Sequence, residues 1–180
     1  MTITRQSKMA NLLIREQIGF QVVAKVEEMK KGYIDKWHKH PWHQIVFPFE
    51  GLLQTRVADT QFVLPHSGLL FIPANTSHES FVMIDTQFVG IYLNPQLNIN
   101  CPLIAKAISV TPFIRELILH INHSVINSSI SEDEVSRLLG VLIDQICGGD
   151  TCNMTLLLPR DKRLMLIFRE LMDNPQLNTK

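Results

Sequence analysis

Four of the seven histidines fall in two short stretches of the chain, and histidine is a common ligand of divalent metals. His38 and His40 lie two residues apart, so on a strand both imidazoles would point to the same face. Such a pair suits zinc, nickel, iron or manganese, and His78 could add a third nitrogen from another strand. By the same alternation Gln44 would lie on the face of His38 and His40, although Pro41 interrupts the strand between them. The spacing indicates a candidate metal site.

Two other interpretations of these histidines stay open. They could line a metal-free pocket for a sugar or other small molecule, or they could form hydrogen bonds within the fold. Trp37 and Trp42 flank the histidine pair, and one of them could stack on a ligand ring, although both could also be packing residues. The candidate ligand contacts are Trp37, Trp42, His38, His40 and His78. We assign no role to His43, His66, His120 and His123.

Residues 20–93 are predicted to form strands. Short apolar runs there alternate with turn signals at intervals of roughly 8–12 residues, a pattern typical of β-sandwiches and barrels. Asp59-Thr60 predicts a hairpin turn, and Pro48 inside a run predicts an edge or a bulge. The expected strands are Phe20–Val26, Gly32–Trp37, Gln44–Phe49, Leu52–Ala58, Gln61–Leu64, Leu69–Ile72, Ser80–Ile84 and Gln87–Leu93.

The apolar period becomes helical after Pro95. Thr111 followed by Pro112 predicts the start of one helix. Ser131 and Glu134 predict a capping box at the start of a second, which Gly148-Gly149 would end. A third helix is expected from about Asp161 to Asn174-Pro175.

Composition argues against nucleic-acid binding by this chain alone. Lysine plus arginine equals aspartate plus glutamate, at 17 each, whereas a nucleic-acid-binding domain usually has a basic surplus. The three cysteines form neither a disulfide framework nor a zinc pattern, so we expect reduced thiols. Residues 1–19 do not resemble a signal peptide, and no apolar run approaches the roughly 18 residues of a membrane span. We therefore expect a cytoplasmic protein.

Both histidine stretches resemble the sequence motifs of cupins. In the first, Gly32, His38, His40, Gln44 and Gly51 follow one another with five, one, three and six residues between them, and Gln44 stands in place of the usual Glu. In the second, Gly68, Pro73, Asn75 and His78 follow one another with four, one and two residues between them. This stretch is one residue shorter than the motif before the proline, and Asn75 stands in place of Gly. Asn also tolerates positive φ.

The cupin resemblance implies a mostly β fold, a double-stranded β-helix (jelly-roll) barrel of the RmlC-like type, followed here by C-terminal helices. In metal-binding cupins the two motifs supply the ligands, which implies His38, His40, Gln44 and His78. An amide oxygen is a poorer ligand than a carboxylate, but three histidines can still hold Zn or Ni.

The helical part resembles regulators of the AraC type. Residues 109–121 are similar to the helix that follows their barrel, and residues 158–175 to the linker leading into their helix-turn-helix domain. The resemblance implies a cupin barrel sensor at 1–100, a helical hairpin at 101–157, and at 158–180 a linker and the start of a DNA-binding domain. It further implies that the C-terminal helix-turn-helix domain is lacking here.

We therefore expect the ligand- or metal-sensing, dimerising domain of a transcription regulator, with a small-molecule effector and no enzymatic activity. It would contact DNA only through the further domain. Amphipathicity of the second helix favours a homodimer contact through Val135, Leu138, Leu142 and Ile146. The alternative is a small metal-dependent cupin enzyme of the dioxygenase or isomerase type, which needs the same histidines and an open coordination position.

Overall fold

Two long strands, β3 (His43–Val57) and β6 (His78–Leu93), are the centre of the fold. The computed structural model describes residue 14, residues 21–97 and 99–151, and residues 163, 167 and 170. β3 and β6 pair antiparallel from His43 opposite Leu93 to Val57 opposite His78. The shorter strands are β1 (Val22–Met29), β2 (Ile34–His38), β4 (Thr60–Pro65), β5 (Gly68–Ile72) and β7 (Lys106–Ser109).

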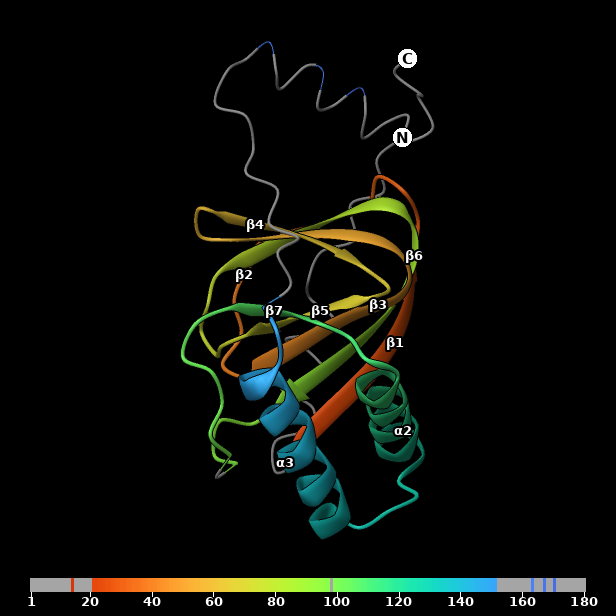
Figure 1. The fold of residues 1–180 in the computed structure, drawn as a ribbon, viewed down its shortest axis with the longest axis vertical. Helices are drawn as coiled ribbons and strands as arrows, with labels where there is room; N and C mark the ends of the chain where they lie inside the picture. The colour runs from red at the N-terminus through yellow and green to blue at the C-terminus, as the bar shows by residue number, and fades with distance from the viewer. Residues whose placement is uncertain are drawn as a thin grey trace.

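The seven strands form one curled sheet in the order β1-β6-β3-β5-β7, with β2 also on β6 and β4 also on β3 (Figure 1). Each long strand changes partners along its length. β1 pairs with residues 86–93 of β6, and β2 pairs with the opposite end of β6. β5 pairs with residues 44–46 of β3, and β4 pairs with residues 52–57. The predicted mostly β architecture with C-terminal helices is confirmed.

A bulged segment in the middle of β3 explains why two strands were expected there. The β3–β6 register shifts around Pro48 and Glu50, so the bulge predicted at Pro48 is confirmed. Gly51 has a φ of +87°, a conformation that other residues rarely adopt. A Cβ on Gly51 would collide with the backbone oxygen of Asp85. Gly51 therefore lets the strand bend while its pairing with β6 continues.

Gly51→Ala is expected to destabilise the protein by at least about 1–3 kcal/mol, the usual penalty of a strained backbone conformation, with the collision adding to it. Gly140→Ala is the matched control, because Gly140 lies within a helix and an added Cβ there meets no atom within 4 Å. Chemical denaturation should show Gly140→Ala at or above wild-type stability. Equal stability of the two variants would contradict the role given to Gly51.

Two helices follow β7: α2 (Pro112–Asn127) and α3 (Glu132–Gly148). The Thr111 side chain caps α2, with Pro112 at its start, and the Ser131–Glu134 capping box begins α3, so both predicted starts are confirmed. The predicted third helix lies mostly outside the described residues. Its described positions, Arg163, Ile167 and Glu170, are helical.

Both helices pack on one face of the sheet, and this overturns the predicted dimer contact. One core cluster contains strand residues such as Ile45 and Ile91 together with apolar residues of α2 and α3. Val135, Leu142 and Ile146 are buried in this cluster within a single chain, and the partly buried Leu138 packs against it. The helical stripe is apolar because it covers the sheet, so these side chains are not available to a second copy.

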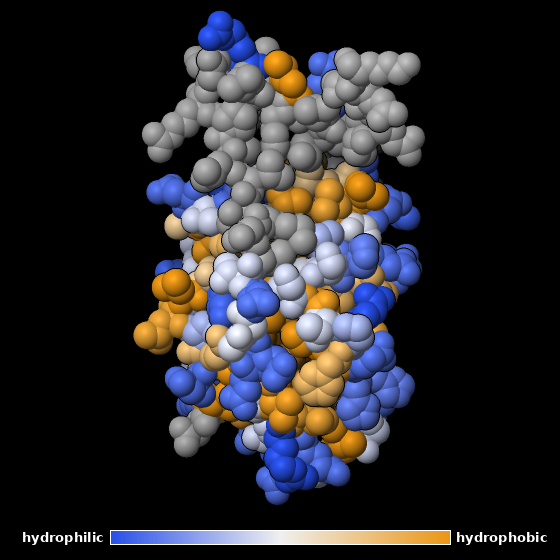
Figure 2. All heavy atoms as spheres, in the orientation of Figure 1, coloured by the Kyte–Doolittle hydropathy of each residue, from blue (hydrophilic) through white to orange (hydrophobic). Residues whose placement is uncertain are grey.

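The sheet also runs past the boundary expected at residue 100. β7 was not predicted; it pairs with β5 from Gly68 opposite Ser109 to Phe71 opposite Lys106. β7 therefore extends the sheet beyond residue 100, and the sheet and the helices share one core. No helix among the described residues is long and apolar enough to span a membrane. On the face shown in Figure 2, apolar side chains are interspersed with polar ones.

Candidate functional site

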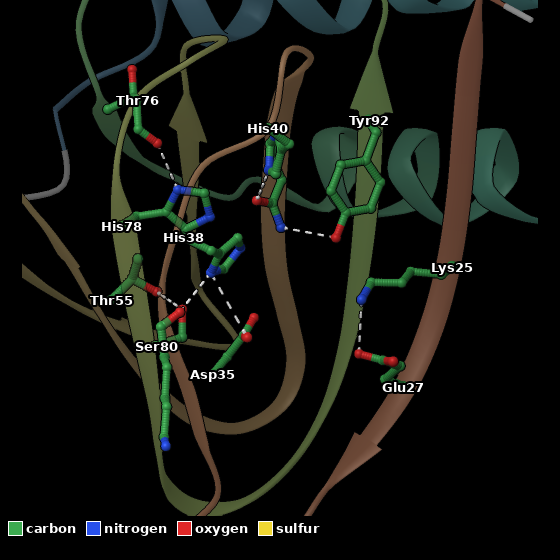
Figure 3. Close-up of polar contacts among 12 residues, drawn as sticks. Lys25, Glu27, Asp35, His38, His40, Thr55, Thr76, His78, Ser80 and Tyr92 are labelled. Atoms are coloured by element: carbon green, nitrogen blue, oxygen red, sulfur yellow. Dashed lines mark hydrogen bonds and ion pairs between the residues drawn. The ribbon is translucent and has the colours of Figure 1, made fainter. Parts of the chain in front are cut away.

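The three predicted metal-binding histidines come together on the sheet. His38 ends β2 and lies opposite His78, which begins β6, while His40 lies in the connection to β3. Their ring centroids are 4.2 Å apart for His38 and His78 and 5.2 Å apart for His40 and His78. Each ring offers a nitrogen that lies within 4.8 Å of the other two (Figure 3). The prediction that these three histidines converge is confirmed.

All three rings are anchored through the same nitrogen. The Nδ1 atoms of His38, His40 and His78 lie 2.8, 2.7 and 2.9 Å from the backbone oxygens of Lys36, Trp42 and Thr76, respectively. A carbonyl oxygen can only accept, so each Nδ1 carries the proton and donates it. In a neutral ring, Nε2 is then left as the free lone pair. Metal-bound histidines are commonly oriented in this way.

His78 is the most constrained of the three. Its side chain is buried, and its Nε2 has no hydrogen-bond partner within the described structure. Burial and the neighbouring His38 lower the pKa of His78 to about 3. Burial also lowers the pKa of His40. Both rings are therefore neutral near pH 7 and can offer a lone pair.

Acid is expected to destabilise the metal-free protein, because the unfolded chain binds a proton at His78 near pH 6.5 and the folded chain does so only near pH 3. The contribution of neutral His78 to the free energy of unfolding is fully present above pH 6.5 and declines as the pH falls toward 3. The loss between pH 6.5 and 5 is about 2 kcal/mol. Denaturation with a chelator present measures it, and His78→Ala should flatten the slope. An unchanged slope would contradict the assignment.

Gln44 completes the cluster from β3. Its Oε1 lies 3.0 Å from Nε2 of His40, and its Nε2 donates to the hydroxyl of Tyr92 at 3.3 Å. Since His40 is neutral and protonated on Nδ1, its Nε2 and the Gln44 oxygen are both acceptors. Two facing acceptors repel each other, and a cation bound by both would remove that repulsion. Together with the unpartnered Nε2 of His78, this donor set fits a divalent metal ion.

The turn before β6 is tied to the same site. Asn75 has a φ of +59°. This confirms the positive φ expected where the cupin motif has glycine. Its backbone N–H donates to the oxygen of His40 at 2.8 Å, and the N–H of Ala74 donates to Nδ1 of His43 at 3.0 Å. These two bonds fix the turn that leads to His78. They also give His43, which had no predicted role, a structural one.

Several ionisable side chains lie beside the histidines. Lys25 pairs with Glu27 at 2.9 Å on β1, and the pKa of Lys25 is raised by Tyr92 and Glu27 despite its burial. Asp35 lies 3.8 Å from Nδ1 of His38, and burial raises its pKa. Burial raises the pKa of Tyr92 to about 12, so its hydroxyl stays protonated.

The two tryptophans contact other groups. Trp42 is buried in a small cluster with Ile14, Val23 and Tyr92. Trp37 is 43% exposed, and the Arg56 guanidinium lies 5.1 Å from its ring. Packing is thus the observed role of the Trp42 ring, while its backbone oxygen holds His40.

Sequence reasoning missed Lys25 and Tyr92. Strand pairing could have identified Tyr92, because it lies directly opposite Gln44 when β3 and β6 are paired. Lys25 and Glu27 alternate with apolar residues on β1, but a charged residue on a strand usually faces solvent. Lys25 instead lies on the same face of β1 as the buried Val23, with its ammonium 5.7 Å from the centre of the Tyr92 ring.

Comparisons with known proteins show likeness of fold. No protein family model matches the chain, and no curated protein matches it. Among solved structures, ToxT from Vibrio cholerae strain SCE256 with a bound unsaturated fatty acid has a TM-score of 0.57 at 10% identity. The match covers 89% of this chain and 66% of that one, so the chain spans about two thirds of ToxT.

A second ToxT structure, from Vibrio cholerae O395 with a naphthalenyl butenoic acid, has a TM-score of 0.53 at 8% identity and covers 89% of this chain and 68% of that one. An RmlC-like cupin from Shewanella frigidimarina is 18% identical, with a TM-score of 0.40, over 42% of this chain and 68% of that one.

Proposed function

We propose that this chain is the cupin-type sensor domain of an AraC-type transcription regulator, and that it holds one divalent metal, Zn or Ni, next to the site of a small effector. The set of three histidines, each anchored to a backbone oxygen through Nδ1 so that Nε2 faces the shared site, carries the proposal. Gln44 supplies a fourth, oxygen ligand. Three imidazoles with one amide oxygen suit these borderline metals. The likeness to ToxT, which includes the helices, supports the regulator part.

The effector is proposed to be small and polar. The two ToxT structures hold a fatty acid and a naphthalenyl butenoic acid as ligands. A long acyl chain needs an apolar lining, whereas this interior carries Lys25, Glu27 and Asp35 beside the histidines. We therefore propose a ligand that binds the metal and forms hydrogen bonds with these side chains.

Strand β3 connects this site to the helices. Gln44 faces the histidines, while its neighbour Ile45 and then Phe47 belong to the core beneath α2 and α3. A shift of β3 on binding would therefore alter the packing of both helices. Its size is limited by the difference in the ligand's affinity for the two states. The zero net charge fits a domain that leaves DNA contact to another part of the regulator.

Titration calorimetry on chelator-treated protein tests the metal part. We expect one Zn²⁺ or Ni²⁺ to bind per chain, with no proton released from His40 or His78 at pH 7, because the lowered pKa values of both keep them neutral. Mg²⁺, which prefers oxygen ligands, should not compete. No binding of Zn²⁺ or Ni²⁺ would exclude a metal-dependent sensor. Sedimentation of the same sample tests the expected homodimer, which stays a prediction.

A small metal-dependent cupin enzyme is the second candidate, and the raised pKa of the half-buried Asp35 favours it. Asp35 contacts Nδ1 of His38, however, on the side of the ring away from the free Nε2. This position suits orientation of the histidine better than proton transfer to a substrate. Asp35→Asn should weaken metal binding under the sensor proposal, whereas a catalytic acid would leave binding intact and remove turnover.

A further inference from the structure

Cys101 and Cys147 are far apart in the sequence but lie on neighbouring parts of the fold. Cys101 lies in the connection between β6 and β7, and Cys147 lies in the last turn of α3 (Figure 1). The Cys147 thiol donates to the backbone oxygen of Asn100 at 3.5 Å. Because Asn100 directly precedes Cys101, the Cα atom of Cys101 is within about 6–7 Å of the Cys147 sulfur. Both cysteines are free thiols in this structure.

This spacing brings a disulfide bond within reach of a small movement. The Cα atoms of disulfide-linked cysteines are usually about 4.4–6.8 Å apart. In the connection that carries Cys101, Leu103 and Ile104 are 93% and 76% exposed, so few packing contacts there resist a small shift. The two thiols already influence each other, because burial and then the neighbouring Cys147 raise the pKa of Cys101 to about 11.

The two thiols differ in accessibility, which decides the order in which they would react. Cys147 is exposed, whereas Cys101 is partly buried against the core beneath the helices. Exchange between thiols and disulfides starts when an accessible thiolate attacks a disulfide sulfur. An oxidant in solution therefore meets Cys147 first, and Cys101 is placed to react with the product.

We propose that Cys101 and Cys147 form a reversible disulfide with each other when a low-molecular-weight disulfide such as oxidised glutathione is present. The Cys147 thiolate attacks one sulfur of the oxidant, which forms a mixed disulfide and releases one thiol. Deprotonated Cys101 then attacks the Cys147 sulfur and releases the second thiol. Both protein thiols are thereby oxidised, the oxidant is reduced to two thiols, and these two thiols take up the two cysteine protons.

The bond would fasten the end of α3 to the sheet. β7 follows Cys101 in the chain and pairs with β5, and just beyond α3 Thr151 forms an isolated bridge with Ile108 of β7. A Cys101–Cys147 disulfide closes a loop that contains β7, α2 and most of α3. Closing a loop of this length stabilises the folded chain, mainly by constraining the unfolded one. Oxidation would therefore limit movement of the helices relative to the sheet that carries the histidines.

Treatment of the chelated protein with oxidised glutathione tests the bond. The Cys152→Ser variant is used first, because it leaves Cys101 and Cys147 as the only cysteines of the chain. Both thiols should become unreactive toward a maleimide, and a tryptic digest should contain the two cysteine peptides joined by a disulfide. The unfolding temperature should rise by about 5–15 °C and return to its starting value when a reductant is added.

Adding Cys101→Ser or Cys147→Ser to Cys152→Ser gives the matched controls, and neither double variant should show an oxidant-dependent rise in unfolding temperature. A lasting glutathione adduct on Cys147, or a disulfide between two chains, in place of the internal bond would overturn the inference. So would a bond in the oxidised wild type that joins Cys147 to Cys152 and leaves Cys101 free. The test uses no metal, so a failure to bind Zn²⁺ would overturn the proposed function without touching this inference.

Discussion

His78→Ala is expected to remove high-affinity metal binding, with a loss of more than roughly 100-fold in Zn²⁺ affinity, since changes to groups that only orient ligands already cost 10–100-fold. The buried Nε2 of His78 has no partner in the described structure, so it is placed to bind something other than protein. Calorimetry on chelator-treated protein measures the change.

The His78→Ala change should affect the folding stability of the metal-free protein differently from its Zn²⁺ affinity. The ring accepts no hydrogen bond at Nε2, so the metal-free variant should remain folded and lose the acid sensitivity described above. His66→Ala is the matched control, because His66 is exposed on the turn between β4 and β5. Retention of wild-type affinity in His78→Ala would contradict the site.

Leu142→Ala is expected to destabilise the chain by about 2–5 kcal/mol, the usual cost of emptying a leucine site in a core. Leu142 is fully buried between α3 and the sheet. The adjacent Val141 is 41% exposed, and Val141→Ala should change stability by no more than about 0.5 kcal/mol. Denaturant unfolding at several protein concentrations separates the effects of folding and association.

The same pair of variants tests how α3 is used. If Leu142 stabilises the chain from within, its replacement lowers the stability by the same amount at every protein concentration. A destabilisation that disappears on dilution, with dissociation seen in sedimentation, would instead restore the dimer contact that the sequence had favoured.

The strands and helix starts were largely predictable because their signals are local. Thr111, Ser131 and Glu134 act within one helical turn, and Asn75 acts within its own turn, so the sequence alone indicates their roles. The length of β3 was not predictable. Gly51 reads as a break between strands, but here it bends a strand whose partner β6 continues across the bend.

The partners of apolar surfaces were harder to predict than the surfaces themselves. The stripe around Leu142 is amphipathic whether it covers a sheet or a second copy, and only the structure shows that the sheet is beneath it. The strand Lys106–Ser109 was missed because four residues carry too little periodicity to stand out. It forms because β5 leaves an edge that it can pair with.

The histidine site was predictable in its members but not in its chemistry. The motifs predicted that His38, His40 and His78 converge, but the expectation that His38 and His40 share one strand was wrong, because β2 ends at His38 and His40 lies in the following connection. The anchoring of each Nδ1 by a backbone oxygen depends on turns whose geometry the sequence does not specify. The acceptor at Gln44 and the phenol of Tyr92 became part of the site only through the pairing of β3 with β6.

X-ray absorption spectroscopy of the Zn²⁺-loaded protein is the most direct test of this site. The account predicts a first shell of nitrogen and oxygen only, at about 2.0–2.2 Å, with the multiple-scattering signal of three imidazoles and no sulfur. Zinc bound by sulfur at about 2.3 Å, or by fewer than three imidazoles, would contradict it.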